Sequence, residues 1–244
     1  MKKNVALLTG FLFLAFVLHA QKKQPKFLTE LSIGPSFPIG KFAATSYKDD
    51  NSERPGWAKP GLAAHLSVGY YLNKSVGVLL SSGYSVHSLN KKAYKHYIEE
   101  VLPGIPVTNM DAKSWKTVKL MAGGFLVTPL TLEEKLVLLT KLTAGVSKTA
   151  EPEVTWNRVS QTPGWTSSGE RKKVPLPWSF CYQVSLALEY KLNHNLYVLL
   201  DISSFNTKAE KEFTYIASTG QDVVVKETYK QATVNALVGI GVRF

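Results

Sequence analysis

The chain of 244 residues carries 29 Lys and Arg against 18 Asp and Glu, a formal net charge of +11, and a single cysteine, Cys181. One cysteine excludes an internal disulfide framework. Beyond residues 1–20 no apolar run approaches the ~20 residues that a membrane-crossing helix needs. This excludes a helical membrane protein but not a membrane β-barrel, because half of each barrel strand faces away from lipid.

The chain begins like an exported protein. Two lysines precede an apolar run over residues 5–18, and the small residue Ala20 then stands before a polar stretch. This order is the layout of a secretory signal peptide. We therefore expect residues 1–20 to be a signal peptide that is cleaved after Sec export, and residues 21–244 to form one domain. An exported basic protein meets an anionic membrane surface rather than nucleic acid, so no nucleic-acid partner is expected.

Apolar and polar residues alternate strictly in eight segments of the expected mature chain. These segments are residues 27–37, 62–72, 76–87, 117–126, 135–146, 180–191, 196–203 and 232–244. In the last one, Val238 and Ile240 fall on an apolar side, whereas Gly239 and Arg243 fall on a small, polar side. A period of two is the signature of a β-strand, because successive side chains leave opposite faces. The sequence therefore predicts eight strands.

Short and long connections alternate between these strands. The short ones are Asn73-Lys74, residues 128–134 and Asn193-His194, and the long, polar ones are residues 39–59, 90–113, 148–176 and 207–230. An up-and-down membrane barrel has this pattern, with short turns at one rim and long loops at the other. The last long segment also has a hairpin pattern, since residues 213–215 and 223–225 flank turn-forming residues.

The direction in which the apolar faces point decides the class of barrel. The apolar faces carry almost no charge over the ~9–11 residues that a strand needs to cross a bilayer. Aromatic residues gather near the strand ends, as in the two girdles of barrels that sit in lipid. The expected girdle residues are Phe27, Tyr70, Tyr190, Tyr197 and Phe244 toward the short turns, and Phe37, Tyr84, Trp115, Trp178 and Tyr182 toward the long loops.

These patterns predict an all-β fold, an eight-stranded antiparallel up-and-down transmembrane β-barrel with a polar lumen, short periplasmic turns and long extracellular loops. One alternative keeps the strands but reverses their faces. It is a soluble exported barrel that binds an apolar ligand inside, as lipocalins do.

Six charged residues fall on the polar faces. They are Glu30, Lys119, Lys141, Glu189, Asp201 and Arg243. Because a buried unpaired charge costs several kcal/mol, we expect three acids and three bases to pair into a structural network that plugs the lumen. A relay for ion passage is the alternative interpretation. Eight strands leave a lumen only wide enough for their own side chains, which excludes a channel of porin width.

The sequence shows no catalytic, cofactor, metal or nucleotide motif. If the protein were an enzyme at its outer rim, the candidates would be His87 with Ser88, and His96 with Asp49 and Asp50. Nothing in their spacing places a nucleophile within hydrogen-bond reach of a base. We therefore expect no enzyme, and a lipid- or peptide-modifying enzyme remains the alternative.

The long loops carry basic clusters and aromatic residues. Lysines and arginines in two loops, Lys91, Lys92, Lys95, Arg171, Lys172 and Lys173, are candidates to contact the phosphates of lipopolysaccharide. Glutamates lie among them, so charge balance and solubility explain the same residues equally well. Trp57, Trp156, Trp165, Tyr94 and Tyr97 are expected to add exposed aromatic surface for an unidentified extracellular ligand or protein.

Residues 21–244 resemble the small bacterial outer-membrane β-barrel family, close in plan to OmpA- and OmpX-type barrels and to PorT-like proteins. The eight strands, the alternating connections and the final Val242-Arg243-Phe244 carry this resemblance. It implies a place in the outer membrane of a Gram-negative bacterium, with Phe244 as the signal read by the barrel-assembly machinery. It also implies a role in adhesion, envelope integrity, secretion support or binding, although no activity transfers by fold alone, and our first hypothesis is a non-enzymatic barrel.

Overall fold

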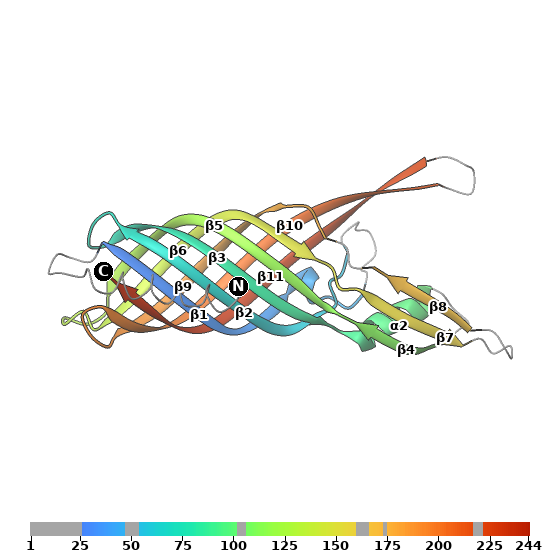
Figure 1. Ribbon diagram of the computed structural model, residues 1–244, viewed down its shortest axis with the longest axis horizontal. Coiled ribbons are helices and arrows are strands. Elements are labelled where there is room, and N and C mark those ends of the chain that lie inside the picture. Colours follow the sequence, from blue (N-terminus) through green and yellow to red (C-terminus); the bar gives the residue numbers. More distant parts are fainter. Residues whose placement is uncertain (1–25, 47–53, 102–105, 160–165, 173–174, 217–221) are drawn as a thin grey trace, which may run out of the picture.

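The computed structural model describes residues 26–46, 54–101, 106–159, 166–172, 175–216 and 222–244. The expected signal peptide, residues 1–20, lies outside the described residues. Eight strands form a closed barrel whose axis runs along the molecule (Figure 1). They are β1 (Phe27–Ile39), β2 (Ala58–Tyr71), β3 (Val76–Leu89), β5 (Ser114–Pro129), β6 (Leu136–Ala150), β9 (Ser179–Lys191), β10 (Leu196–Ile216) and β11 (Asp222–Arg243).

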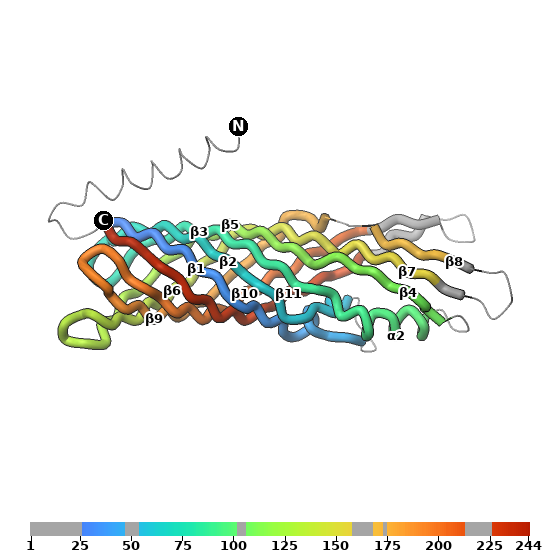
Figure 2. Tube along the Cα trace, turned by 60° about the horizontal axis from the view of Figure 1, so that its bottom comes forward, coloured from blue at the N-terminus to red at the C-terminus, as the bar shows by residue number. Residues whose placement is uncertain are grey.

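Each barrel strand pairs antiparallel with its sequence neighbours within the barrel, and β1 closes the cylinder against β11. The closing register runs from Leu28 opposite Arg243 to Ile39 opposite Ala232. The C-terminal end of β11 therefore lies beside the start of β1, at the end of the barrel that carries the short turns (Figure 2). The predicted eight-stranded up-and-down topology is confirmed.

The strands point their apolar side chains outward and their polar side chains inward. Along β1, Leu31 and Ile33 are 55% and 57% exposed, whereas Glu30 and Ser32 between them are 3% and 6% exposed. The same alternation holds around the cylinder, so the outer surface is aliphatic and the interior holds serine, threonine and charged residues. A protein in water has the opposite arrangement. The barrel is therefore built for an apolar surrounding.

Two of the short connections are the same turn. Asn73 Oδ1 accepts hydrogen bonds from the backbone N–H groups of Ser75 and Val76, and Asn193 Oδ1 does the same for Asn195 and Leu196. An asparagine side chain that bonds the backbone two residues on mimics a turn and stabilises it. The sequence identified both turns correctly.

The opposite end carries a small folded unit, which we call the head. It consists of helix α2 (Lys91–Val101) and a three-stranded sheet made of β4 (Val107–Ala112), β7 (Val154–Val159) and β8 (Thr166–Arg171), in the order β4-β7-β8. A short 3-10 helix, η1 (Gly40–Phe42), follows β1. None of the helices in the described part of the chain is both long enough and apolar enough to cross a membrane.

The head was not expected, because residues 90–113 and 148–176 were interpreted as irregular loops. Asn90 starts α2: its Oδ1 accepts the backbone N–H of Ala93, as an N-cap residue does. Tyr94 and Ile98, four residues apart, are the buried residues of the helix. That spacing is the local signal of an amphipathic helix. The interpretation of these segments as structureless was wrong.

Strands β10 and β11 continue far beyond the barrel. β10 pairs with β9 only as far as Thr207, and β11 pairs with β1 only from Ala232 onward. Beyond these points the two strands pair with each other alone, up to Ile216 opposite Asp222. We call residues 208–216 and 222–230 the hairpin extension. The predicted hairpin in the last loop is confirmed, and Figure 1 shows it projecting from the same end as the head.

In the described part of the chain, buried apolar residues form three clusters. One fills the junction of barrel and head, and includes Trp57, Tyr94 and Trp115. A second closes the short-turn end of the lumen, with Leu28, Phe125, Leu139 and Tyr197. A third, made of Met121, Cys181 and Phe205, lies between them.

Several aromatic assignments were wrong. Trp57 and Tyr94, expected as exposed surface, are 1% and 5% exposed. Their rings pack against each other with centroids 4.9 Å apart. Tyr197 and Trp115, expected in the girdles, point inward: Tyr197 donates to Glu30 Oε1, and Trp115 Nε1 donates to the Gly56 carbonyl. Trp165 lies outside the described residues.

Candidate functional site

Two groups of charged side chains are candidates for function: the ionic interior of the barrel and a cluster at the junction of barrel and head. In the interior, Lys141 of β6 lies between Glu30 of β1 and Asp201 of β10. Its Nζ donates to Glu30 Oε2 over 2.5 Å and lies 3.4 Å from Asp201 Oδ2. All three side chains are buried. One cation thus joins acids from two other strands across the lumen.

A second pair lies closer to the short-turn end. Arg243 Nη2 donates to Glu189 Oε2, and the Arg243 guanidinium stacks over the rings of Tyr197 and Tyr71, 4.8 Å and 5.7 Å from their centroids. Arginine bonds a carboxylate through a planar fork and also stacks on aromatic faces. The inward tyrosines therefore take part in holding the C-terminal strand.

Lys119 has no acid within ion-pair distance in the described structure. Its Nζ donates to Gln183 Oε1 over 2.6 Å and lies 4.3 Å from the centre of the Phe205 ring. An amide oxygen and an aromatic face both favour a cation. The lumen therefore holds one triad and one pair, with Lys119 held separately.

The lumen has almost no free space at its centre. The cavity between Glu30, His65, Lys141 and Asp201 has a volume of about 10 Å³. A single water molecule needs at least ~10–15 Å³ measured in this way. Side chains therefore fill the centre of the lumen, and a structural plug remains the prediction for these charges.

The second cluster joins three connections at the base of the head. Arg54, from the connection between β1 and β2, lies 3.1 Å from Glu227 Oε2 and donates to the Tyr229 hydroxyl over 3.2 Å. Arg171 of β8 donates from Nη2 to both oxygens of Glu151 at 3.0 Å. Arg54 also lies 3.7 Å from Glu151, which ties the two halves together. We call these five residues the rim cluster.

The rim cluster is buried enough to change its acid–base behaviour. Burial raises the pKa of Glu151 to about 7, against the opposing effect of the Arg54 charge. Burial and the Glu151 charge also raise the pKa of Tyr229. The Tyr229 hydroxyl stays protonated and donates to Glu227 Oε2 over 2.5 Å. The cluster thus clamps the head and the hairpin extension to the barrel.

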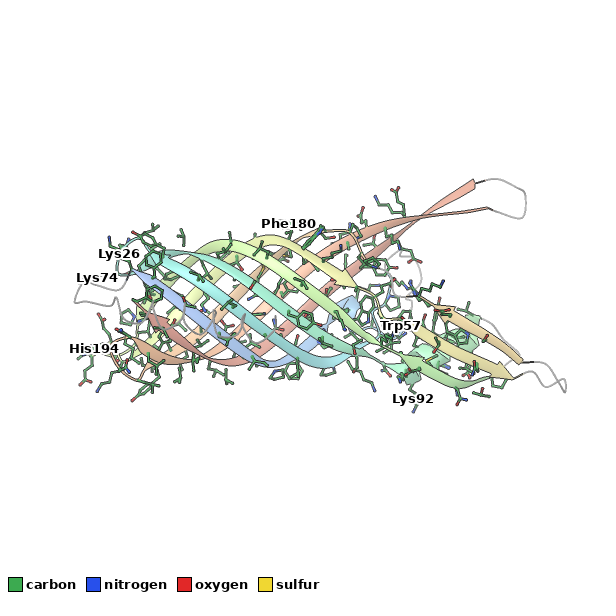
Figure 3. All side chains as sticks on the ribbon, viewed as in Figure 1. Lys26, Trp57, Lys74, Lys92, Phe180 and His194 are labelled. Carbon is green, nitrogen blue, oxygen red and sulfur yellow. The ribbon has the colours of Figure 1, made fainter. Side chains whose placement is uncertain are left out.

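The basic loop residues proposed for lipopolysaccharide are held in several ways. Lys91 Nζ lies 2.8 Å from Asp111, and Lys95 Nζ lies 3.8 Å from Glu99. Lys92 and Lys172 are exposed, while Arg171 belongs to the rim cluster. Lys173 lies outside the described residues. Figure 3 shows Lys92 and Trp57 toward the head end, and Lys26, Lys74 and His194 at the opposite, short-turn end.

Phe244 lies at the seam where the barrel closes. Its ring stacks on Phe27 with centroids 5.8 Å apart, and its backbone exchanges hydrogen bonds with Phe27. This last residue is therefore part of the β1–β11 pairing.

Within the described residues a serine–histidine contact occurs inside the barrel, and it does not involve the serine beside His87. His87 Nε2 lies 2.9 Å from Ser36 Oγ, and both residues are fully buried. The Ser36 hydroxyl donates to Asn235 Oδ1 over 2.6 Å, while Asn235 Nδ2 donates to Ser203. Since the Ser36 proton is directed at Asn235, His87 Nε2 acts as the donor, not as a base.

The other enzyme candidate lies only partly within the described residues. His96 is exposed on α2 and lies 3.1 Å from Glu100, one helical turn away. Asp49 and Asp50 lie outside the described residues. Among the residues described, no group of three His, Cys, Asp or Glu side chains is placed to hold a metal ion.

Sequence reasoning missed Arg54, Glu151, Tyr229, Ser36 and Asn235. The rim cluster joins positions up to 175 residues apart, which no local spacing can reveal. Ser36 and Asn235 did lie on the polar faces of their strands, but alternation does not say which lumen residues of different strands meet.

The closed barrel, its aliphatic exterior and its ionic interior define a transmembrane β-barrel with the architecture of the small outer-membrane barrels. In barrels of this architecture the short turns form the periplasmic rim and the long connections, which here carry the head and the hairpin extension, are extracellular.

No family model and no curated protein matches the chain. Solved structures do resemble its fold. Ail, the attachment invasion locus protein of Yersinia pestis, is 15% identical with a TM-score of 0.41, over 91% of this chain and 100% of that one. Neisserial surface protein A is 9% identical with a TM-score of 0.47, over the same two shares. The outer membrane protease OmpT from Escherichia coli is 9% identical with a TM-score of 0.36, over 93% of this chain and 99% of that one. Each of these similarities concerns the fold alone.

Proposed function

We propose that this protein is a non-enzymatic barrel of the Gram-negative outer membrane, and that its extracellular head and hairpin extension bind a partner outside the cell. The observation that carries the proposal is the outer part of the hairpin extension, where neither strand pairs with a third strand in the described part of the chain. From Glu212 to Ile216, and from Asp222 to Lys226, each strand has only the other as its partner strand among the described residues, whereas the base of the extension packs on the junction, where the Arg54 backbone N–H donates to the Thr228 carbonyl. Free edge groups are ready to pair with an extended segment of another protein.

A second feature supports binding rather than a purely structural role. The head shares a buried apolar core with the end of the barrel, and the rim cluster fixes it there through Arg171 and Glu151. A preorganised surface loses less conformational entropy on binding than a flexible loop does. Charges along the exposed base of the hairpin extension, where Glu210 lies 2.7 Å from both Lys208 and Lys226, limit pairing with identical copies.

The test removes the tip of the hairpin extension and leaves the rim cluster in place. Glu212 and Lys226 are directly opposite, so a two-residue Asn-Gly turn can replace residues 213–225. Cells that display the full protein should bind at least one member of a panel of immobilised glycans and extracellular proteins, and cells that display the shortened protein should lose that binding. A matched control shortens residues 130–135 at the periplasmic rim. Binding that survives removal of the tip would refute the proposal.

Biogenesis is part of the same proposal. Residues 1–20 would be removed after Sec export, and Phe244 would be read by the barrel-assembly machinery. Mass spectrometry of the membrane-extracted protein should show an N-terminus close to Gln21. A Phe244→Ala variant should reach the outer membrane in smaller amounts, and an intact first segment or unchanged assembly would contradict this part.

Catalysis at the outer rim is the second candidate function, and the His87–Ser36 contact is the observation that raises it. The direction of the Ser36 hydrogen bond and the full burial of both residues argue against it. If a lipid- or peptide-cleaving activity were found, its loss in His87→Ala or His96→Ala would favour an enzyme. A soluble carrier of an apolar ligand does not fit an interior of buried charges.

A further inference from the structure

Two lysines stand on the outer wall of the barrel just above its aliphatic band. Lys116 of β5 and Lys148 of β6 both point outward and are exposed, whereas the lumen lysines on the same strands are buried. Lys148 is directly opposite Val118, and Lys116 is opposite Ala150, so the two are diagonal neighbours on adjacent strands. Two cations at this height lie where the phosphate groups of the outer leaflet lie.

An aromatic pair accompanies them. The ring of Trp178 is 56% exposed, and the Lys148 ammonium lies 5.7 Å from its centre. Phe180 is 66% exposed on the same wall (Figure 3) and lies opposite Val146, two residues before Lys148 on β6. Tryptophan prefers the boundary between water and hydrocarbon. Trp178 thus marks Lys148 as a residue of the membrane boundary.

The same two strands carry an apolar groove further down. It has a volume of about 560 Å³ and is lined by Val76, Ala122, Gly124, Leu126, Leu142 and Ala144. Ala122 and Ala144 are directly opposite each other, so two small side chains form its floor. A Cβ added at Gly124 would meet only the Gly77 carbonyl oxygen, at 3.4 Å, so the space above it is open.

The spacing between lysines and groove matches one lipid. Ala144 is four residues below Lys148, about 13 Å at the strand rise of ~3.3 Å per residue. One leaflet of the hydrocarbon core is about 15 Å deep. An acyl chain that starts from a phosphate-bearing head at the lysines would therefore reach the groove.

We propose that the outer wall of β5 and β6 is a binding site for an acylated, phosphorylated glycolipid of the lipid A class, with Lys116 and Lys148 on its phosphate and one acyl chain in the groove. This goes beyond partner binding by the head. Helix α2, with its basic residues, lies beyond the barrel strands (Figure 1) and away from this boundary. Charge complementarity favours this lipid, because the lysines have no acid within ion-pair distance in the described residues.

The test measures binding of diphosphoryl lipid A to the full mature protein in detergent, by native mass spectrometry. Lys116→Ala with Lys148→Ala should weaken binding by about tenfold or more, since Lys–phosphate contacts are charge-assisted. Ala122→Leu with Ala144→Leu fills the groove and should weaken lipid A binding by about threefold to tenfold, the range for a lost apolar contact. Dephosphorylated lipid A should bind the wild type as weakly as diphosphoryl lipid A binds the lysine variant.

Matched controls keep the result unambiguous. Lys74→Ala with Lys135→Ala removes two exposed lysines at the periplasmic rim, and Ala232→Leu with Ala236→Leu adds the same bulk on β11; both should leave lipid A affinity unchanged. The mobility of unheated protein on SDS gels shows that each variant is folded. Equal loss in the controls, unchanged affinity in the lysine variant, or displacement of lipid A by equimolar phosphatidylglycerol or inorganic phosphate would overturn the proposal.

Discussion

Replacing Lys141 with methionine should remove the cation on which the ionic interior depends. Lys141 Nζ donates to Glu30 over 2.5 Å and lies 3.4 Å from Asp201, and the two acids are 3% and 4% exposed. Removal of one partner from a buried ion pair costs about 3–5 kcal/mol, because the remaining charge is left without a partner. Here two carboxylates lose the same cation, so the free energy of unfolding should fall by about 4 kcal/mol or more.

The assay is equilibrium unfolding in urea of the protein reconstituted in phospholipid vesicles, followed by tryptophan fluorescence. Lys141→Met combined with Glu30→Gln and Asp201→Asn should recover most of the loss, because no unpaired charge remains. Lys135→Met is the control: its pair with Glu133 is exposed, so the change should stay within about 1 kcal/mol. A Lys141→Met protein as stable as the wild type, or a triple variant no better than the single one, would refute the reasoning.

Four further outcomes are expected. Trp57→Ala should remove a fully buried ring from the junction and lower its local stability by about 3–5 kcal/mol, seen as faster hydrogen exchange in the head with barrel mobility on gels unchanged. Burial raises the pKa of Glu151 to about 7, so protonated Glu151 should stabilise the rim fully below about pH 4, and this stability should be lost as the pH rises through about 7. Hydrogen exchange at the rim should therefore become faster over this pH range, and Glu151→Gln should abolish that pH dependence. The lysines on either side lower the pKa of Glu210 to about 2, so a carboxyl titration by NMR should find it there, and Lys226→Ala should move it up toward the usual value. Val238→Arg, on the outer wall, should cost about 2–4 kcal/mol in vesicles, and a neutral effect there would mean that this wall does not face lipid.

The barrel could be predicted from the sequence because one periodic signal carries it. The side chains of a strand between lipid and a polar lumen must alternate between apolar and polar, so this alternation alone assigned Glu30 and Lys141 to the interior. The same alternation placed Tyr197 on the inner face of its strand, so the expectation that Tyr197 belongs to an aromatic girdle conflicted with the strand pattern. Alternation does not show which inward side chains of different strands meet, so the hydrogen bond between Lys119 and Gln183 could not be predicted.

The head and the rim cluster were beyond local reasoning. Helix α2 left a signal in the spacing of Tyr94 and Ile98, but it is short and lies among charged residues. The strands β4, β7 and β8 are six residues each, and β4 is far in sequence from its partner β7. Contacts such as that between Arg54 and Tyr229 depend on the closed barrel, which brings the ends of distant strands together.

Collision accessibility of a spin label at position 186 tests the orientation of the strands most directly. Leu186 is 51% exposed on the outer wall, and its neighbour Ala187 is fully buried. A nitroxide on Leu186→Cys, in a Cys181→Ala protein in vesicles, should collide with oxygen, which concentrates in lipid, far more often than with a water-soluble nickel complex. A label that met the nickel complex more often would place this wall in water and contradict the membrane barrel.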